Sequence, residues 1–127
     1  MESGNHLPSR QFYFCEGMNW TRVSSKFAVR LSPSGSVFNS ACPTVFVRDE
    51  LENYTLALLN STVAKVYLDL LSPTINFQAG DVGKIPYIRN GAKYEDTERL
   101  TRSAIESSKE DWDSYETSWD FKRNPLV

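Results

Sequence analysis

The side chains that most often carry chemistry are scarce and scattered in this chain. His6 and the two cysteines, Cys15 and Cys42, fit no zinc-binding spacing. Asp111 and Asp113 lie two residues apart and could act as an acid and a base, but they fall in an acidic run whose carboxylates we expect to be solvated. Phosphate-loop, dinucleotide-binding and nucleophile-elbow motifs are absent from the sequence. We therefore predict no catalytic residue and no metal site, and an independent small enzyme is the least favoured interpretation.

Length and composition indicate one domain with a real core. The chain has 127 residues, of which 40% are hydrophobic and 13% aromatic. Its net charge of −2 is too close to zero to indicate a dedicated nucleic-acid binder. No apolar run is long enough to cross a membrane, and the first ten residues do not resemble a signal peptide. We expect a cytoplasmic protein with no membrane partner, whose cysteines are buried small hydrophobes.

The first half of the chain predicts a small, mainly antiparallel sheet. Residues 11–17 are aromatic and strand-like, and a polar loop follows them. Residues 26–32 alternate, with Phe27, Val29 and Leu31 on one face and Lys26, Ala28 and Arg30 on the other, which is typical of a half-buried strand. A Pro-Gly turn at 32–35 predicts that 36–40 pairs with this strand as a hairpin. The continuous apolar run at 43–47 predicts a third strand, buried on both faces.

The second half predicts mostly helix. Asp49, with Glu52 as a partial capping box, should begin one long helix over residues 50–71, which Pro73 ends. Residues 74–78 should be extended, Gly80 should make a turn, and Asp81 could cap a short helical turn. A further helix is expected over 94–112, followed by an acidic, aromatic stretch. The predicted fold class is therefore α+β: a small sheet packed on one long helix, then a C-terminal helical, acidic segment.

Three stretches carry a resemblance to a known family. Residues 56–87, with LLNS and the Gly80-Asp81 to Pro86 segment, look like target-recognition regions of methyltransferases that modify adenine in DNA. Residues 17–47 and 108–127 resemble two conserved stretches of PglX-type methyltransferases from BREX phage-defence systems, and the run DWDSYETSWDF is the most specific match. The family's Asn-Pro-Pro-Tyr motif and its S-adenosylmethionine site have no counterpart in this chain.

The resemblance implies a target-recognition part that is not catalytic by itself and holds no cofactor, with S-adenosylmethionine bound elsewhere in the full-length family. Residues 1–10 would be a disordered tail, 11–93 the recognition domain and 94–127 a helical, acidic connector. The partners would be double-stranded DNA and the catalytic domain or other defence proteins. The structural junction would comprise Pro73, Gly80, Asp81 and Pro86.

The same resemblance suggests residues that could contact DNA. Candidates for phosphate contact are Arg22, Lys26, Arg30, Lys84, Arg89 and Lys93, and candidates for adenine edges are Asn76 and Gln78. Each has a plainer alternative, since a cationic strand face can simply be solvated and amide side chains can satisfy turn backbone. Trp20 is expected to be packed, and Trp112 and Trp119 to dock the acidic segment against its own domain. The rival function is a protein-interaction module that scaffolds a defence complex.

Overall fold

The computed structural model describes residues 9–89 and 91–126, which divide into two compact units between Tyr87 and Ile88. Most of the predicted N-terminal tail, and His6 with it, lies outside the described residues. The α+β fold class is confirmed, because the first unit holds a three-stranded antiparallel sheet and short helices, and the second holds one long helix. The assignment of functions to residues 11–93 and 94–127 stays a prediction.

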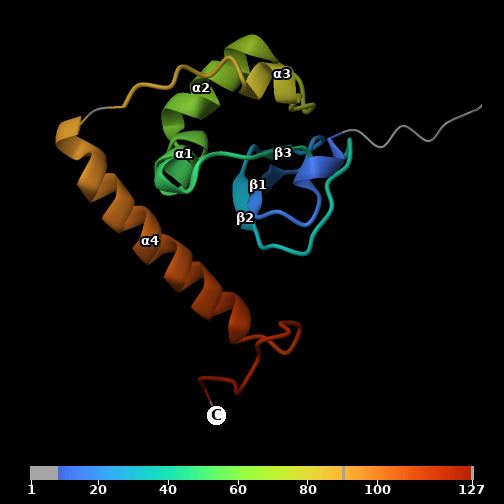
Figure 1. The fold of residues 1–127 in the computed structure, drawn as a ribbon, viewed down its shortest axis with the longest axis vertical. Helices are drawn as coiled ribbons and strands as arrows, with labels where there is room; N and C mark the ends of the chain where they lie inside the picture. Colours follow the sequence, from blue (N-terminus) through green and yellow to red (C-terminus); the bar gives the residue numbers. More distant parts are fainter. Residues whose placement is uncertain (1–8, 90, 127) are drawn as a thin grey trace, which may run out of the picture. The chain divides into compact units, whose positions relative to one another are not determined.

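The sheet consists of β1 (Gly17–Trp20), β2 (Val29–Ser32) and β3 (Thr44–Val45) in the order β2-β1-β3 (Figure 1). The central strand, β1, falls mainly in the segment predicted to be a polar loop, so that prediction is wrong. The aromatic stretch before it instead begins with a 3-10 helix, η1 (Arg10–Phe12). Met18 and Trp20 alternate with Asn19 and are almost fully buried, and this alternation is the signal for a half-buried strand.

The strands flanking β1 depart from the sequence prediction in their pairing. β2 pairs with β1, with Asn19 opposite Arg30, and the predicted hairpin partner at 36–40 forms only an isolated bridge between Asn39 and Cys42. The chain after the turn is instead bonded to the segment before β1, because Phe14 N–H donates to Ser36 O at 3.0 Å. β3 lies at an edge and is half-exposed, which corrects the prediction of burial on both faces.

The predicted long helix is interrupted. A 3-10 turn, η2 (Asp49–Leu51), leads into α1 (Glu52–Leu59), and a break at residues 60–61 separates α1 from α2 (Thr62–Leu71). Asp49 makes no side-chain cap, whereas Ser61 caps α2 by accepting a hydrogen bond from Ala64 N at 3.2 Å. α2 ends before Pro73 as predicted. The helices then continue with α3 (Ala79–Val82), and Figure 1 shows α1 to α3 grouped beside the sheet.

The core of the first unit lies between the sheet and these helices. Its buried side chains are Met18, Trp20, Val29, Leu56, Leu59, Ala64, Leu68, Phe77, Val82 and Ile85. Burial of this apolar surface is the main force that holds the short strands and helices together.

The second unit is built on α4 (Gly91–Asp113), a helix of 23 residues that includes the predicted span. Hydrogen-bonded turns follow it, as Ser118 Oγ donates to Asp113 at 2.6 Å and accepts from Asp120 N at 3.1 Å. In the part of the chain that the structure describes, every helix is too short or too polar to cross a membrane.

Candidate nucleic-acid interface

One candidate site lies where the chain after β1 meets the segment before α3. Arg22 and Ser24 bond to Phe77 and Ile75 through their backbones, at 2.7 and 2.9 Å, so that Val23 forms a bridge with Asn76. Residues 74–78 were predicted to be an extended segment, and in the structure they form a single bridge, that of Asn76 with Val23, and no full strand. Two polar candidates, Arg22 and Asn76, thereby become neighbours although 54 positions separate them in the sequence.

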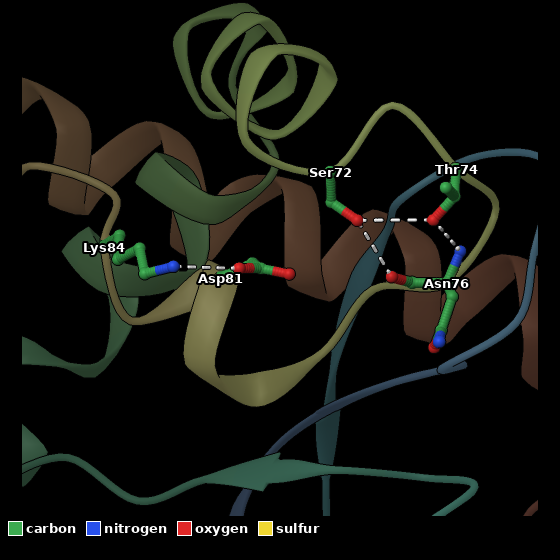
Figure 2. A network of polar contacts seen from close by, with 5 residues as sticks. All are labelled: Ser72, Thr74, Asn76, Asp81 and Lys84. Atoms are coloured by element: carbon green, nitrogen blue, oxygen red, sulfur yellow. Dashed lines mark hydrogen bonds and ion pairs between the residues drawn. The ribbon is translucent and has the colours of Figure 1, made fainter.

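Asn76 is held by contacts on both its backbone and its side chain. Figure 2 shows that Ser72 Oγ donates to Asn76 O at 3.2 Å and that Asn76 N donates to Thr74 Oγ1 at 3.3 Å. The Asn76 side chain is left to accept a hydrogen bond from Arg22 Nε at 3.0 Å. The Ser-Pro-Thr sequence after α2 thus fixes the loop that presents Asn76 to Arg22.

Buried aromatic residues hold together the two segments that carry Arg22 and Asn76. Trp20 donates from Nε1 to Phe77 O at 2.9 Å, and Phe27 packs between the two rings, with centroid distances of 5.9 Å to Trp20 and 5.2 Å to Phe77. Trp20 is 2% exposed, which confirms that it is packed. The segment that carries Arg22 and Asn76 is therefore joined to the core by a hydrogen bond and by ring contacts.

A second arginine–asparagine pair lies on the polar face of the sheet. Arg30 Nε donates to Asn19 Oδ1 at 3.0 Å, and the register places Asn19 opposite both Arg30 on β2 and Thr44 on β3. The bond uses Nε, so the two Nη groups of this exposed arginine can still donate to an anion. The predicted alternation is confirmed, because Val29 is buried while Lys26, Ala28 and Arg30 are exposed. The predicted strand over 26–32 is shorter in the structure, since β2 begins at Val29.

The other candidates divide between the two units. Lys84 forms an ion pair with Asp81 at 3.1 Å, and Gln78 is exposed at the start of α3. Arg89 lies over the Tyr94 ring at 4.2 Å, and both it and Lys93 belong to the second unit. Lys84 belongs to the first unit, and the contact of all three residues with DNA stays a prediction.

The predicted roles of Gly80 and Asp81 at the junction need correction. Asp81 does not cap α3, because Gln78 occupies the N-cap position and the Asp81 carboxylate pairs with Lys84 (Figure 2). The predicted turn at Gly80 is wrong, because Gly80 lies within α3, and a Cβ atom added there would meet no atom within 4 Å. Pro73 lies two residues after the end of α2 and Pro86 follows buried Ile85, and the role of both in a junction stays a prediction.

Asn60, in the LLNS sequence, has a structural role that sequence reasoning did not assign. Its side chain accepts from Val29 N at 3.0 Å and donates to Val29 O at 2.9 Å. It also donates to Leu56 O at 3.0 Å. The resemblance pointed to this stretch, but only the fold shows that the asparagine joins the end of α1 to β2.

The carboxyl group of Glu52, in α1, has a shifted pKa. Burial raises the pKa of Glu52, and the negative charges of Glu16 and Asp49 raise that pKa further. In the described ranges, no group of three or more His, Cys, Asp or Glu side chains could hold a metal ion. Cys15 is exposed and Cys42 half-buried, so the expectation that both are buried hydrophobes is wrong for Cys15.

Comparison with curated proteins gives the class: the chain is similar to a segment of adenine-specific methyltransferases. It is 41% identical over 126 residues to the adenine-specific methyltransferase BrxX of Escherichia coli O9:H4 (strain HS), an alignment that covers 96% of this chain and 10% of that protein. It is 38% identical over 125 residues to the adenine-specific methyltransferase PglX of Lacticaseibacillus casei (strain Zhang), with 97% and 10% covered. No family model matches the chain. The resemblance to PglX-type proteins is confirmed, and the chain spans about a tenth of the length of these relatives.

Proposed function

We propose that this chain is the DNA target-recognition part of an adenine-specific DNA methyltransferase of a BREX phage-defence system, one that modifies adenine at N6. The observation that carries the proposal is the match along nearly the whole chain to BrxX and PglX, both named adenine-specific methyltransferases. A methyltransferase must turn its target base out of the duplex and must also find the site. The second task needs a surface that fixes register on phosphates and contacts base edges.

The two arginine–asparagine pairs support such a surface. Arg22 and Arg30 are each held at Nε by an asparagine Oδ1 at 3.0 Å, which orients the guanidinium group before any ligand arrives. An oriented guanidinium group binds phosphate or guanine with two parallel hydrogen bonds and loses less side-chain freedom on binding. Lys26, four residues before Arg30, is exposed and adds a third positive charge.

Gln78 is better suited than Asn76 to contact adenine. A bidentate contact to adenine needs the amide oxygen as acceptor and the amide nitrogen as donor. The oxygen of Asn76 already accepts from Arg22, whereas Gln78 is exposed at the first turn of α3. We therefore assign Asn76 to positioning Arg22, and Gln78 to direct base contact.

Catalysis would reside elsewhere in the longer protein. These 127 residues contain neither the Asn-Pro-Pro-Tyr motif nor the glycine-bearing S-adenosylmethionine site that the resemblance leads one to expect in the full-length family. We expect no methyl transfer by this chain alone, and we expect S-adenosylmethionine to bind the catalytic domain.

A protein-interaction module is the second candidate function, and the stretch 110–121 favours it. The stretch holds five carboxylates and no lysine or arginine, and such charge repels phosphate. Trp112 is 59% exposed and Trp119 is fully exposed, so large aromatic surfaces are open to a partner. The predicted docking of these tryptophans onto the first unit stays a prediction.

Duplex binding at several salt concentrations separates the two functions. A recognition part should bind duplex DNA with an affinity that falls steeply as salt rises, with a slope of about −0.9 per phosphate contact. Binding that is absent at low salt, together with stable association with the catalytic domain, would favour the interaction module.

A further inference from the structure

Helix α2 has two apolar faces, and only one of them is covered by the rest of the first unit. Ala64 and Leu68 face the core and are 0% and 1% exposed. The second face, which we call the α2 stripe, follows the spacing i, i+3, i+4, i+7 and consists of Val63, Val66, Tyr67 and Leu70. Their exposed fractions are 54%, 52%, 40% and 76%. A helix at the surface of a domain normally has one apolar stripe, and a second stripe indicates a second packing partner.

The charges on α2 indicate which partner fits. The remaining sector of the helix carries one lysine, Lys65, and one aspartate, Asp69, and both are exposed. A helix that binds a membrane surface carries a polar face rich in lysine and arginine, and so does one that binds nucleic acid. A neutral rim around an aliphatic and aromatic stripe fits an apolar protein surface.

The size of the stripe favours a partner within the same polypeptide. α2 has 10 residues and is about 15 Å long, so its stripe buries much less than the roughly 800 Å² per partner of a standard interface between separate chains. A contact this small can still form when the two surfaces belong to one polypeptide, because the covalent link gives each a high effective concentration around the other. The matched segment is only 10% of BrxX and of PglX, so both relatives contain further polypeptide that could supply this partner.

We infer that the α2 stripe is the surface by which this part docks onto the apolar face of another part of the same methyltransferase chain. The inference rests on the proposed function in one respect, namely that the chain works within a longer methyltransferase. It does not depend on DNA recognition, because no candidate DNA-contacting residue lies on α2. In this arrangement α2 is a central layer, with Ala64 and Leu68 facing the recognition core and the stripe facing the remaining protein.

The inference can be tested by inserting this chain into a full-length relative. The matched segment of E. coli BrxX is replaced by this chain, and hydrogen–deuterium exchange over residues 62–71 is compared with that of the isolated chain. We expect exchange to slow about tenfold or more in the long protein. The double variant V66D/L70D should abolish this slowing, while V37D, a change at an exposed valine in a loop, should leave it intact.

Two further measurements keep the inference falsifiable. In the isolated chain, V66D/L70D should leave the thermal midpoint and the salt-dependent binding of duplex DNA unchanged. A lowered midpoint, or a dimer that the double variant dissociates, would overturn the inference. In a pull-down, immobilised BrxX that lacks its matched segment should retain the wild-type chain and V37D but not V66D/L70D. Equal retention of the three proteins would also contradict the inference. Absence of duplex binding by the wild-type chain would overturn only the recognition proposal.

Discussion

The side-chain amide of Asn60 pairs with the backbone of Val29 as one further strand residue would, accepting from its N–H at 3.0 Å and donating to its carbonyl at 2.9 Å. This contact satisfies the outer edge of β2 at a position where the sheet has no further strand. It also fixes the point at which α1 ends and the chain turns into α2. The LLNS sequence therefore joins the helices to the sheet.

Asn60→Ala should destabilise the protein by about 1–3 kcal/mol, because partly buried backbone groups of Val29 lose their partner. Asn60→Asp retains an acceptor for Val29 N but places a carboxylate against Val29 O, so it should cost at least as much. Urea unfolding monitored by circular dichroism gives both values. If the aspartate variant is as stable as the wild type, the two-way pairing is not the reason for asparagine at this position.

Trp20→Phe should cost about 1–3 kcal/mol, since it leaves the buried Phe77 carbonyl without its donor. Trp119→Phe is the matched control, because Trp119 is fully exposed and its loss should change the unfolding free energy very little. Thermal and urea unfolding of the two variants measure the contrast. Equal effects at the two tryptophans would show that the Trp20–Phe77 bond does not anchor the junction.

Loss of the Ser61 hydroxyl and loss of the Asp81 carboxylate should change the free energy of unfolding by different amounts. Ser61→Ala removes a true cap of α2 and should cost about 1 kcal/mol. Asp81→Ala removes only an ion pair with a lysine whose side chain is 62% exposed, and should cost no more than about 0.5 kcal/mol. The free energies of unfolding of the two variants are compared at one temperature, and the reverse order would restore the capping role first predicted for Asp81.

Glu52 should make stability depend on pH in a defined direction. Burial, followed by the charges of Glu16 and Asp49, raises its folded pKa above the ordinary value of 4.5. The folded state then holds the proton more tightly than the unfolded chain, so this group's contribution to stability falls as pH rises from about 4.5 through the folded pKa. Glu52→Gln should be more stable than the wild type above that range and equally stable below it. Urea midpoints across the range test this, and a gap that widens on acidification would refute the assignment.

The sequence predicted those elements whose signals are local. Pro73 ends α2 because proline disfavours helix in the residue before it, and the alternation around Val29 was visible without the fold. β1 was missed because Asn19 and Gly17 are weak strand formers, and only burial of Met18 and Trp20 between sheet and helices reveals the strand. The helix break at 60–61 was missed for a similar reason, since Asn60 stops α1 through a contact to a residue 31 positions away.

The candidate site shows the same division. Residue type and local spacing selected Arg22, Arg30 and Asn76 as polar groups, but they did not predict that Asn76 orients Arg22 or that Asn19 orients Arg30. Both pairs join segments that lie next to each other only in the folded sheet and junction. Lys84 belongs to the first unit and Arg89 and Lys93 to the second, so their common role in DNA contact stays a prediction.

The most direct test of DNA recognition is a salt titration of duplex binding, measured by fluorescence anisotropy, for the wild type, R22Q/R30Q and R99Q. Arg99 pairs with Asp96 on α4 and is the matched control, because it lies outside the candidate interface. The wild type and R99Q should bind with a steep salt dependence, and the double variant should lose affinity and have a slope smaller by about 2. Its thermal midpoint is recorded alongside, so that a folding defect is not taken for a lost contact. If all three proteins bind alike, or if none binds at low salt, this chain does not recognise DNA through these arginines.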